Sequence, residues 1–224
     1  MKNLTIFVIL IGLWSCKGQT NSSPNQTVKE ITGKTTILTP SEIQISDSLN
    51  IDFQFRAYCY AYSSAKNAVK SNGEAHSDNL PKKIDSFFPR QGLYLVINQN
   101  EIGRFDNSIL AHKLYLVNTT DSSIELDASD SRLNIVAEAL NDKKEWIKIS
   151  YVSGNRYHTV VLDKDEYWSF NVPILKGTTK TKLRYILKID ENKKISSNEI
   201  ICFVNQGQFE AEYEEESSNK CNFE

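Results

Sequence analysis

Apolar and polar residues alternate with a period of two along most of this chain, and this alternation restricts its fold more than any other feature. The pattern is clear over residues 51–59, 133–139 and 183–189. A period of two is typical of strands that bury one face in a core and leave the other toward water. The chain is therefore predicted to be all-β, with Ala57 and Cys59 among the inward-facing residues.

Turn-forming residues separate the predicted strands at intervals of roughly ten residues. Ser153-Gly154-Asn155 and Lys176-Gly177 are two of these turns. Short strands joined in this way favour an antiparallel immunoglobulin-like β-sandwich. Further strands are predicted over residues 93–98, 109–118, 123–128, 146–152, 157–162, 167–172, 199–205 and 208–213.

The domain organisation is predicted from a polar stretch at 71–92, which contains Pro81 and Pro89 and is interpreted as a long loop. It separates a smaller N-terminal β segment with its loop, 35–92, from a β-sandwich over 93–213. A single domain, in which the early strand completes the later sheet, fits the pattern equally well. The one helix expected is a short segment over 63–72.

The N-terminus has the form of a targeting signal. Lys2 precedes an uncharged run from Leu4 to Trp14, whose eleven residues would span about 16 Å as a helix, about half of a bilayer core. Such a run indicates a secretory signal rather than a membrane-spanning helix. Its ending, Leu13-Trp14-Ser15-Cys16, resembles the lipobox of bacterial lipoproteins, although Trp14 stands where a small or aliphatic residue is usual.

The lipobox resemblance implies that residues 1–15 are a signal peptide and that Cys16 is lipidated after cleavage. Residues 16–34 are polar and are predicted to be a flexible tether. An ordinary signal peptide with an incidental cysteine is the alternative. By the same resemblance, Lys17 rather than Asp favours the outer membrane, and the late first acidic residue, Glu30, favours its periplasmic face.

Several segments of the second half, NTTDSS, DSRLNIVAEAL, GNRYH, KTKLRY and SNEI, look like parts of Bacteroidota envelope lipoproteins of uncharacterised activity. The resemblance covers about half of the chain and implies no reaction. It agrees with a protein that is exported and held at a membrane.

The charge of the chain is unevenly distributed. There are 26 Lys and Arg against 28 Asp and Glu, a net charge of -2, and this near-neutral balance argues against nucleic acid as a partner. Six Glu and one Lys occupy the last fifteen residues, so that 214–224 form an acidic tail. Such a tail binds cations or a basic partner, or is simply a solvated end.

If Cys16 carries lipid, then Cys59, Cys202 and Cys221 remain, an odd number for an oxidising compartment. Cys59 and Cys202 both fall on the apolar side of their strands, and a disulfide between them is predicted. Two buried free thiols, or a bridge from Cys202 to Cys221, are the alternatives.

Candidate ligand-binding residues cluster at one turn. Asn155, Tyr157 and His158 follow Gly154, in a place where loops often carry function. His76 and His112 have no second ligand at metal spacing, and no metal or cofactor is expected. Asp121, Asp127 and Asp130 suggest calcium ligands, but turn capping explains them better.

Aromatic residues offer a second candidate surface. Tyr58, Tyr60 and Tyr62 share one face of the early strand, and such a row can stack on sugar rings or form an interface. Packing against the loop at 71–92 is the alternative interpretation. Trp146 and Trp168 are the remaining tryptophans of the predicted mature chain.

No motif of a phosphate loop, a nucleophile elbow or a zinc protease is present in the sequence. The predicted function is therefore a non-catalytic binding or structural role of a lipid-anchored envelope protein, with an envelope protein or glycan as partner. A carbohydrate-binding protein and a hydrolase that uses His158 are the alternatives.

Overall fold

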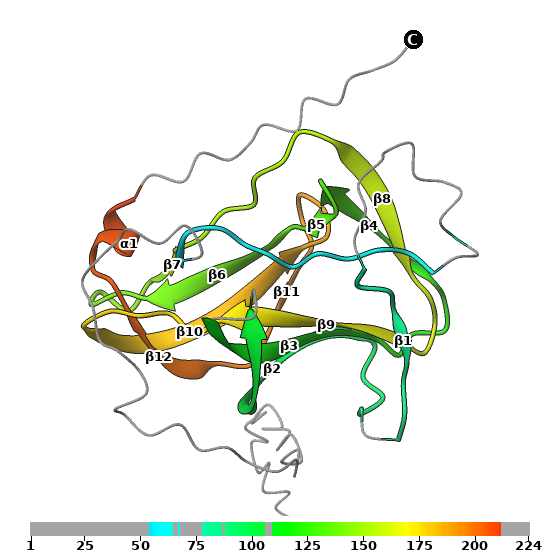
Figure 1. Cartoon of the computed structure of the whole chain (residues 1–224), viewed down its shortest axis with the longest axis horizontal. Coiled ribbons are helices and arrows are strands. Elements are labelled where there is room, and N and C mark those ends of the chain that lie inside the picture. The colour runs from blue at the N-terminus through cyan, green and yellow to red at the C-terminus, as the bar shows by residue number, and fades with distance from the viewer. Residues whose placement is uncertain (1–53, 65–66, 68–77, 87, 106–108, 212–224) are drawn as a thin grey trace, which may run out of the picture. The chain divides into compact units, whose positions relative to one another are not determined.

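The strands form three antiparallel sheets around a shared apolar core (Figure 1). The computed structural model describes residues 54–64, 67, 78–86, 88–105 and 109–211. The all-β sandwich prediction is confirmed. The more specific immunoglobulin-like topology stays a prediction.

Each sheet combines strands that are distant in sequence. The four-stranded sheet has the order β1 (Lys82–Lys83), β9 (Glu166–Pro173), β3 (Ile109–Asn118) and β2 (Leu93–Phe105). The five-stranded sheet has the order β11 (Lys194–Ser196), β10 (Thr179–Lys188), β6 (Ile135–Leu140) and β7 (Trp146–Lys148), with β12 (Ile200–Val204) also paired to β10. The three-stranded sheet has the order β5 (Arg132–Leu133), β4 (Ile124–Ser129) and β8 (Tyr157–Leu162).

Alternate residues of all three sheets point into the core, as the period of two predicts. In β10, Leu183, Tyr185 and Leu187 are buried and pair in register with buried residues of β6. Trp168 of β9 is fully buried between the sheets, and its indole Nε1 donates to the carbonyl of Tyr62 at 3.1 Å. The buried indole N–H is therefore hydrogen-bonded.

The segment 54–64 joins the sheets and lies along them as the cyan ribbon of Figure 1. Tyr151 exchanges backbone hydrogen bonds with Phe55 and Ala57 beyond the end of β7, while Cys59 and Ala61 bond to the β5 strand and its turn. The Ser63 hydroxyl then accepts from Val161 of β8. We call this segment the seam. Its bonds make it part of the sandwich.

The free edge of β2 is closed by a side chain. Asn198, between β11 and β12, accepts from the Ile97 amide at 2.8 Å and donates to the Ile97 carbonyl at 3.0 Å. The amide group thus replaces a neighbouring strand at one residue. This contact satisfies an edge that would otherwise offer unpaired backbone groups to another chain.

The outer face of the four-stranded sheet is covered by its own aromatic cluster. Phe88 packs on Tyr115 and Tyr167 with ring centroids 5.5 and 4.8 Å apart. Tyr94 and Ile84 belong to the same cluster. The stretch 71–92, predicted as a loop, therefore includes β1 and a segment that covers apolar surface.

Two local predictions need correction. The strand predicted over 208–213 is wrong, because Gly207–Glu210 form a short helix, α1. The Asn205 side chain accepts from the Gly207 amide, and the buried Gln208 side chain returns to the Asn205 amide, so local polar bonds outweigh the strand pattern. Of the predicted helix at 63–72, Ser63 and Ser64 are not helical, Asn67 lies in a turn, and the rest lies outside the described residues.

Candidate functional site

The candidate site lies at a tight turn between β4 and β5. Ser129 pairs with Arg132, so that Asp130 and Ser131 alone form the loop. Both have positive φ, 46° and 63°, which is the geometry of a type I′ hairpin turn. Asp tolerates this conformation better than most residues, while a serine in it carries some strain. The turn therefore fixes the direction in which the neighbouring Arg132 points.

Arg132 is held in place by uncharged partners. Its Nε and Nη2 donate to the Tyr60 hydroxyl oxygen at 2.9 and 2.7 Å, and its Nη1 donates to the Ser153 carbonyl. The guanidinium carbon also lies 4.9 Å from the centroid of the Tyr60 ring. No salt bridge joins Arg132 to any described residue. Its position is thus fixed while its charge stays uncompensated by a direct acidic partner.

Arg56 of the seam contributes a second guanidinium. Its Nε donates to the Tyr151 hydroxyl at 3.0 Å, and its guanidinium carbon lies 6.0 Å from the centroid of that ring. Like Arg132, it is therefore positioned by a tyrosine of a neighbouring segment. Hydroxyl bonds and stacking of this kind order an arginine side chain.

Asp130 connects the turn to the loop opposite. Its carboxylate accepts from Arg156 Nε at 2.8 Å and from the Asn155 amide at 3.3 Å. The Arg156 hydrogen bond is the main reason that the pKa of Asp130 lies below its ordinary value. Asp130 is therefore ionised at neutral pH and keeps Arg156 engaged at the rim.

A glycine allows the loop to approach the turn closely. A Cβ at Gly154 would lie 2.3 Å from the Ser129 hydroxyl oxygen and 3.0 Å from an Asp130 carboxylate oxygen. The Ser129 side chain is buried beneath it and has no hydrogen-bond partner among the described residues. Any larger residue at position 154 would push the loop outward.

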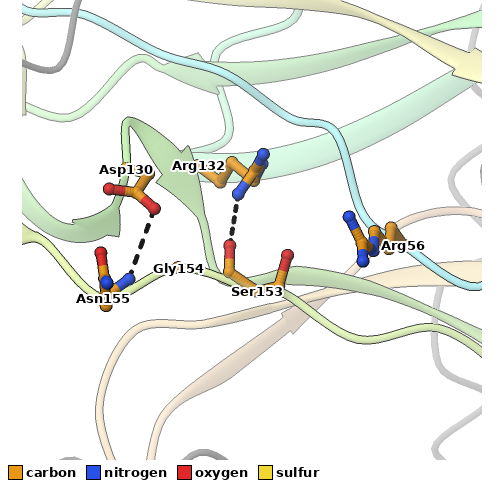
Figure 2. Close-up of a pocket in the computed structure, with 6 residues that line it drawn as sticks. All are labelled: Arg56, Asp130, Arg132, Ser153, Gly154 and Asn155. Atoms are coloured by element: carbon orange, nitrogen blue, oxygen red, sulfur yellow. Dashed lines mark hydrogen bonds between the residues drawn. The ribbon is translucent and has the colours of Figure 1, made fainter.

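Together these groups line an open pocket of about 390 Å³, formed by Arg56, Asp130, Arg132, Ser153, Gly154 and Asn155. Figure 2 shows Arg132 directed toward the Ser153 carbonyl and Asp130 toward Asn155, with Arg56 entering from the other side. Two guanidinium groups face one carboxylate that Arg156 already pairs. The pocket is therefore suited to an anionic group and has no apolar floor.

The residues predicted at the 153–158 turn fall at or beside this pocket. Asn155 lines it, and Tyr60 supports Arg132 from behind. Tyr157 is 56% exposed on β8, next to the turn, since it pairs with Ser129. Tyr58 instead packs on Phe105, with ring centroids 4.8 Å apart.

His158 does not have the surroundings of a catalytic base. Its Nδ1 lies 3.4 Å from the Arg156 carbonyl oxygen, and its buried Nε2 has no hydrogen-bond partner among the described residues. A hydrolase of the kind considered from the sequence would place a carboxylate against this ring. Among the described residues, no carboxylate is hydrogen-bonded to this ring.

The aromatic residues do not form one flat platform. Trp168 is fully buried, and the rings of Tyr58 and Tyr60 are inclined by 37° with centroids 6.5 Å apart. Trp146 lies elsewhere, under the guanidinium of Arg184 on the five-stranded sheet. Stacking on a sugar ring needs exposed aromatic faces, which Trp168 cannot offer.

The predicted disulfide between Cys59 and Cys202 is not present, since both are buried free thiols. Burial raises the pKa of the Cys202 thiol to about 12 and also raises that of Cys59. Both keep their protons at neutral pH and pack as small apolar groups, because only the thiolate exchanges readily. Cys221, Cys16 and His76 lie outside the described residues.

The aspartates considered as calcium ligands have other partners. Asp121 pairs with Lys164 at 3.0 Å, Asp130 pairs with Arg156, and Asp127 is exposed on β4. Within the described part of the chain, no three His, Cys, Asp or Glu side chains converge as a metal site requires.

His112 is half-buried on the inner side of β3, where desolvation lowers its pKa to about 4. The desolvated ring favours its neutral form, although a backbone hydrogen bond near Gln99 opposes this shift. Its Nδ1 has no hydrogen-bond partner among the described residues. It belongs to the interior rather than to the pocket.

Sequence comparison assigns no known group to this chain. No family model matches the sequence, and no curated protein matches it significantly. Among the described residues, no helix is long and apolar enough to cross a bilayer. The function must therefore be argued from the pocket and from the sequence signals.

The sequence did not single out Arg56 and Arg132, the two residues that give the pocket its charge. Arg132 follows the Asp130-Ser131 pair directly, so a two-residue hairpin at this place would have indicated that its side chain stands beside the turn. Arg56 had no such local signal, because only the pairing of the seam with Tyr151 brings it there.

Proposed function

We propose that this protein is a lipid-anchored envelope protein that binds an anionic group without catalysing a reaction. The observation that carries the binding function is Arg132, which is held by two neutral oxygen partners and has no described salt bridge, beside Arg56 in an open pocket. A carboxylate or phosphate group would supply the missing negative charge. Arginine suits both, because its planar donors pair with two oxygens at once.

The pocket is pre-formed for this task. The ring of Tyr60, its hydroxyl and the Ser153 carbonyl fix the guanidinium of Arg132 before a ligand arrives. Little side-chain freedom is then lost on binding, which favours affinity. The shallow, open form of the pocket fits a terminal or branching anionic group of a larger envelope component better than an enclosed small molecule.

The location rests on the N-terminal sequence. The lipobox-like Leu13-Trp14-Ser15-Cys16 supports acylation of Cys16, and Lys17 with the late Glu30 supports the periplasmic face of the outer membrane. Three acyl chains would exceed what stable anchoring needs. Replacing Cys16 by Ser should release the full-length protein from membranes into the soluble fraction of bacteria that export it. Retention in the membrane fraction would contradict the anchor.

The binding function can be tested by calorimetric titration of the full chain at constant ionic strength, with sodium phosphate, succinate and glucuronate as separate probes. We expect binding of at least one probe and a loss of about tenfold or more in affinity for Arg132→Gln. The preference among the probes would separate phosphate from carboxylate recognition. Arg104→Gln, an exposed arginine on β2 outside the pocket, is the matched control and should bind unchanged.

Two results would contradict the proposal. One is the absence of binding by any of the three anions to the folded protein. The other is an equal loss of affinity in the Arg104 and Arg132 variants, which would indicate a diffuse charge effect rather than a site. Circular dichroism of each variant would establish that the β-sandwich is intact.

A further inference from the structure

The outward face of the five-stranded sheet carries a concentration of basic residues. Leu183, Tyr185 and Leu187 of β10 point into the core, so Lys182, Arg184 and Lys188 lie on the opposite face of the sheet. Ile186 lies on this opposite face too, but it is buried. The register extends this face to β6, β7, β11 and β12. Six basic residues lie on it, Lys148, Lys180, Lys182, Arg184, Lys188 and Lys194, and we call it the lysine face.

Most of this charge is not compensated within the described residues. Arg184 pairs with Glu138 at 2.7 Å, and Lys182 pairs with Glu199 at 2.8 Å. No salt bridge joins the remaining four lysines of the face to a described residue, and Lys180 and Lys194 are exposed. A surface of this kind attracts a partner with distributed negative charge.

Apolar side chains are interspersed among the lysines. Ile201 of β12 is 54% exposed and lies opposite Lys182 in the pairing with β10. Phe203 lies opposite Lys180 on the same side, and Trp146 of β7 packs under Arg184 with the guanidinium carbon 4.1 Å from the ring centroid. Long lysines around aromatic and aliphatic groups are typical of surfaces that meet a lipid headgroup layer, where the apolar parts enter and the ammonium groups stay near phosphates.

The described part of the chain begins beside this sheet. At the first described residues, the Gln54 carbonyl accepts from Gln208 Nε2, and the Phe55 carbonyl accepts from the Tyr151 amide beyond the end of β7. In Figure 1 the cyan ribbon of the seam begins near β7. The predicted tether, residues 16–34, would span roughly 25 Å as a flexible chain, so an anchor at Cys16 would keep the body close to the bilayer.

We propose that the lysine face docks on an anionic phospholipid surface next to the anchor. The inference rests on the proposed lipid anchor and adds an orientation to it. The anchor would hold the body at high local concentration near the bilayer, and the lysines would select the face that turns toward it. The pocket lined by Arg132 belongs to other strands and would not take part in this contact.

The test uses the full-length, lipidated protein mixed with vesicles of phosphatidylcholine alone or with one quarter phosphatidylglycerol. Flotation reports on the anchor, and acetylation of lysines with a water-soluble ester, read by mass spectrometry, reports on the face. We expect flotation with both vesicles. We also expect acetylation of Lys180 and Lys194 to slow at least threefold on the anionic vesicles only, and to recover at high salt. Lys82 and Lys113, on the four-stranded sheet, are the internal controls.

Charge reversal gives the matched variants. The double variant Lys180→Glu with Lys194→Glu should still float, but the protection of Lys182 and Lys188 should disappear. The double variant Lys82→Glu with Lys113→Glu changes the charge equally on another sheet and should keep that protection. Loss of protection in both variants would overturn the proposal, because the total charge would then be sufficient.

The outcomes separate the anchor from the face. Flotation with both vesicles but equal acetylation of all lysines would retain the anchor and overturn the face. Flotation with anionic vesicles alone, together with protection, would retain the face and overturn the anchor. Failure to float with either would overturn both. Slow acetylation without vesicles that becomes fast when residues 212–224 are deleted would identify the acidic tail as the occupant and overturn the membrane proposal.

Discussion

Arg132 and Arg184 both stack on an aromatic ring, but among the described residues only Arg184 has an acidic partner. Each lies against an aromatic ring, Arg132 at 4.9 Å from the Tyr60 centroid and Arg184 at 4.1 Å from the Trp146 centroid. Arg184 also donates twice to Glu138, at 2.9 and 2.7 Å, whereas Arg132 donates to a hydroxyl and a carbonyl of the described residues. Stacking is therefore common to both arginines, and the nature of the hydrogen-bond acceptor is what distinguishes them.

His112 is a third basic group, and its pKa is lowered by desolvation. It is half-buried on the inner side of β3, and the lowered pKa keeps it uncharged at neutral and mildly acidic pH. Arg184 is thus paired with an acid, His112 is kept uncharged, and Arg132 stays charged beside the pocket. Only the third arrangement makes a ligand favourable, because the other two groups gain nothing from an added anion.

Alanine substitutions at Gly177 and Gly154 should have the largest effects on stability. The size of the effect should differ between the five-stranded sheet, which Gly177 contacts, and the pocket loop, which contains Gly154. A Cβ at Gly177 would lie 2.0 Å from the Val204 backbone in the sheet of Arg184, whereas at Gly154 it meets the Ser129 hydroxyl at 2.3 Å. We expect Gly177→Ala to cost about 3 kcal/mol or more and Gly154→Ala about 1–2 kcal/mol, because a loop can move and a paired strand cannot. Urea unfolding measures both values.

Only Gly154→Ala should weaken anion binding, because only that loop lines the pocket. Calorimetric titration with the anion that binds the unmodified chain measures this effect. Equal loss of binding in the two glycine variants would show that stability, and not the pocket, governs affinity.

The suppressed charge of His112 predicts a dependence of stability on pH. The unfolded chain takes up a proton on this ring below about pH 6.5, whereas the folded chain does so only near pH 4. The free energy of unfolding should therefore be independent of this group above pH 6.5 and should fall by up to about 3 kcal/mol between pH 6.5 and 4. Urea unfolding at several pH values would measure it, with His112→Gln as the variant in which this decrease is smaller. An identical decrease in both proteins would contradict the assignment.

The variants Glu138→Gln and Arg132→Gln test whether Arg184 and Arg132 have different roles. Glu138→Gln leaves the half-buried Arg184 without its charged partner, and we expect a loss of about 1 kcal/mol in stability with no change in anion binding. Arg132→Gln should instead reduce anion affinity about tenfold, together with a loss of about 1–2 kcal/mol in stability from its bonds to Tyr60 and Ser153. Thermal denaturation and calorimetry on the two variants decide between a stabilising and a binding arginine.

The smallest effect is expected for Asp130→Asn. The substitution removes a negative charge from the pocket and weakens the hold on Arg156, so anion affinity should increase a few-fold while stability changes little. Asp165→Asn, at another residue with positive φ that pairs with Arg90, is the control and should leave affinity unchanged. A decrease in affinity for the Asp130 variant would mean that this carboxylate holds the pocket in shape.

The sequence predicts strands where side chains alternate and fails where polar side chains bond locally. The predicted 109–118 and 157–162 coincide with β3 and β8, because Leu114, Leu116, Val160 and Leu162 all face the core. The predicted 93–98 covers only part of β2, which continues past an irregularity between Asn98 and Ile102. Gln208 is buried for its hydrogen bonds rather than its apolar character, so α1 had no hydrophobic signal.

The pocket was only partly predictable. Asn155 was found because turn residues are a local signal. Arg56 and Arg132 were not, since Tyr60 and Arg132 are 72 residues apart and meet only after the seam has paired with β5. Alternation places a side chain on a face of its strand but says nothing about which distant strand will lie beside it.

The seam, residues 54–64, can complete its hydrogen bonds only after residues near the end of the chain are available. Residues 54–64 leave the ribosome early, yet Tyr62 accepts from Trp168 and Gln54 accepts from Gln208, 154 residues later. Contacts this distant in sequence slow folding, because most of the chain must be ordered before they form. If the chain is exported N-terminus first, as the proposed anchor requires, it would cross the membrane with its first core segment unpaired for most of translocation. We expect it to depend on holding factors during export more than on any slow step after the last strand arrives.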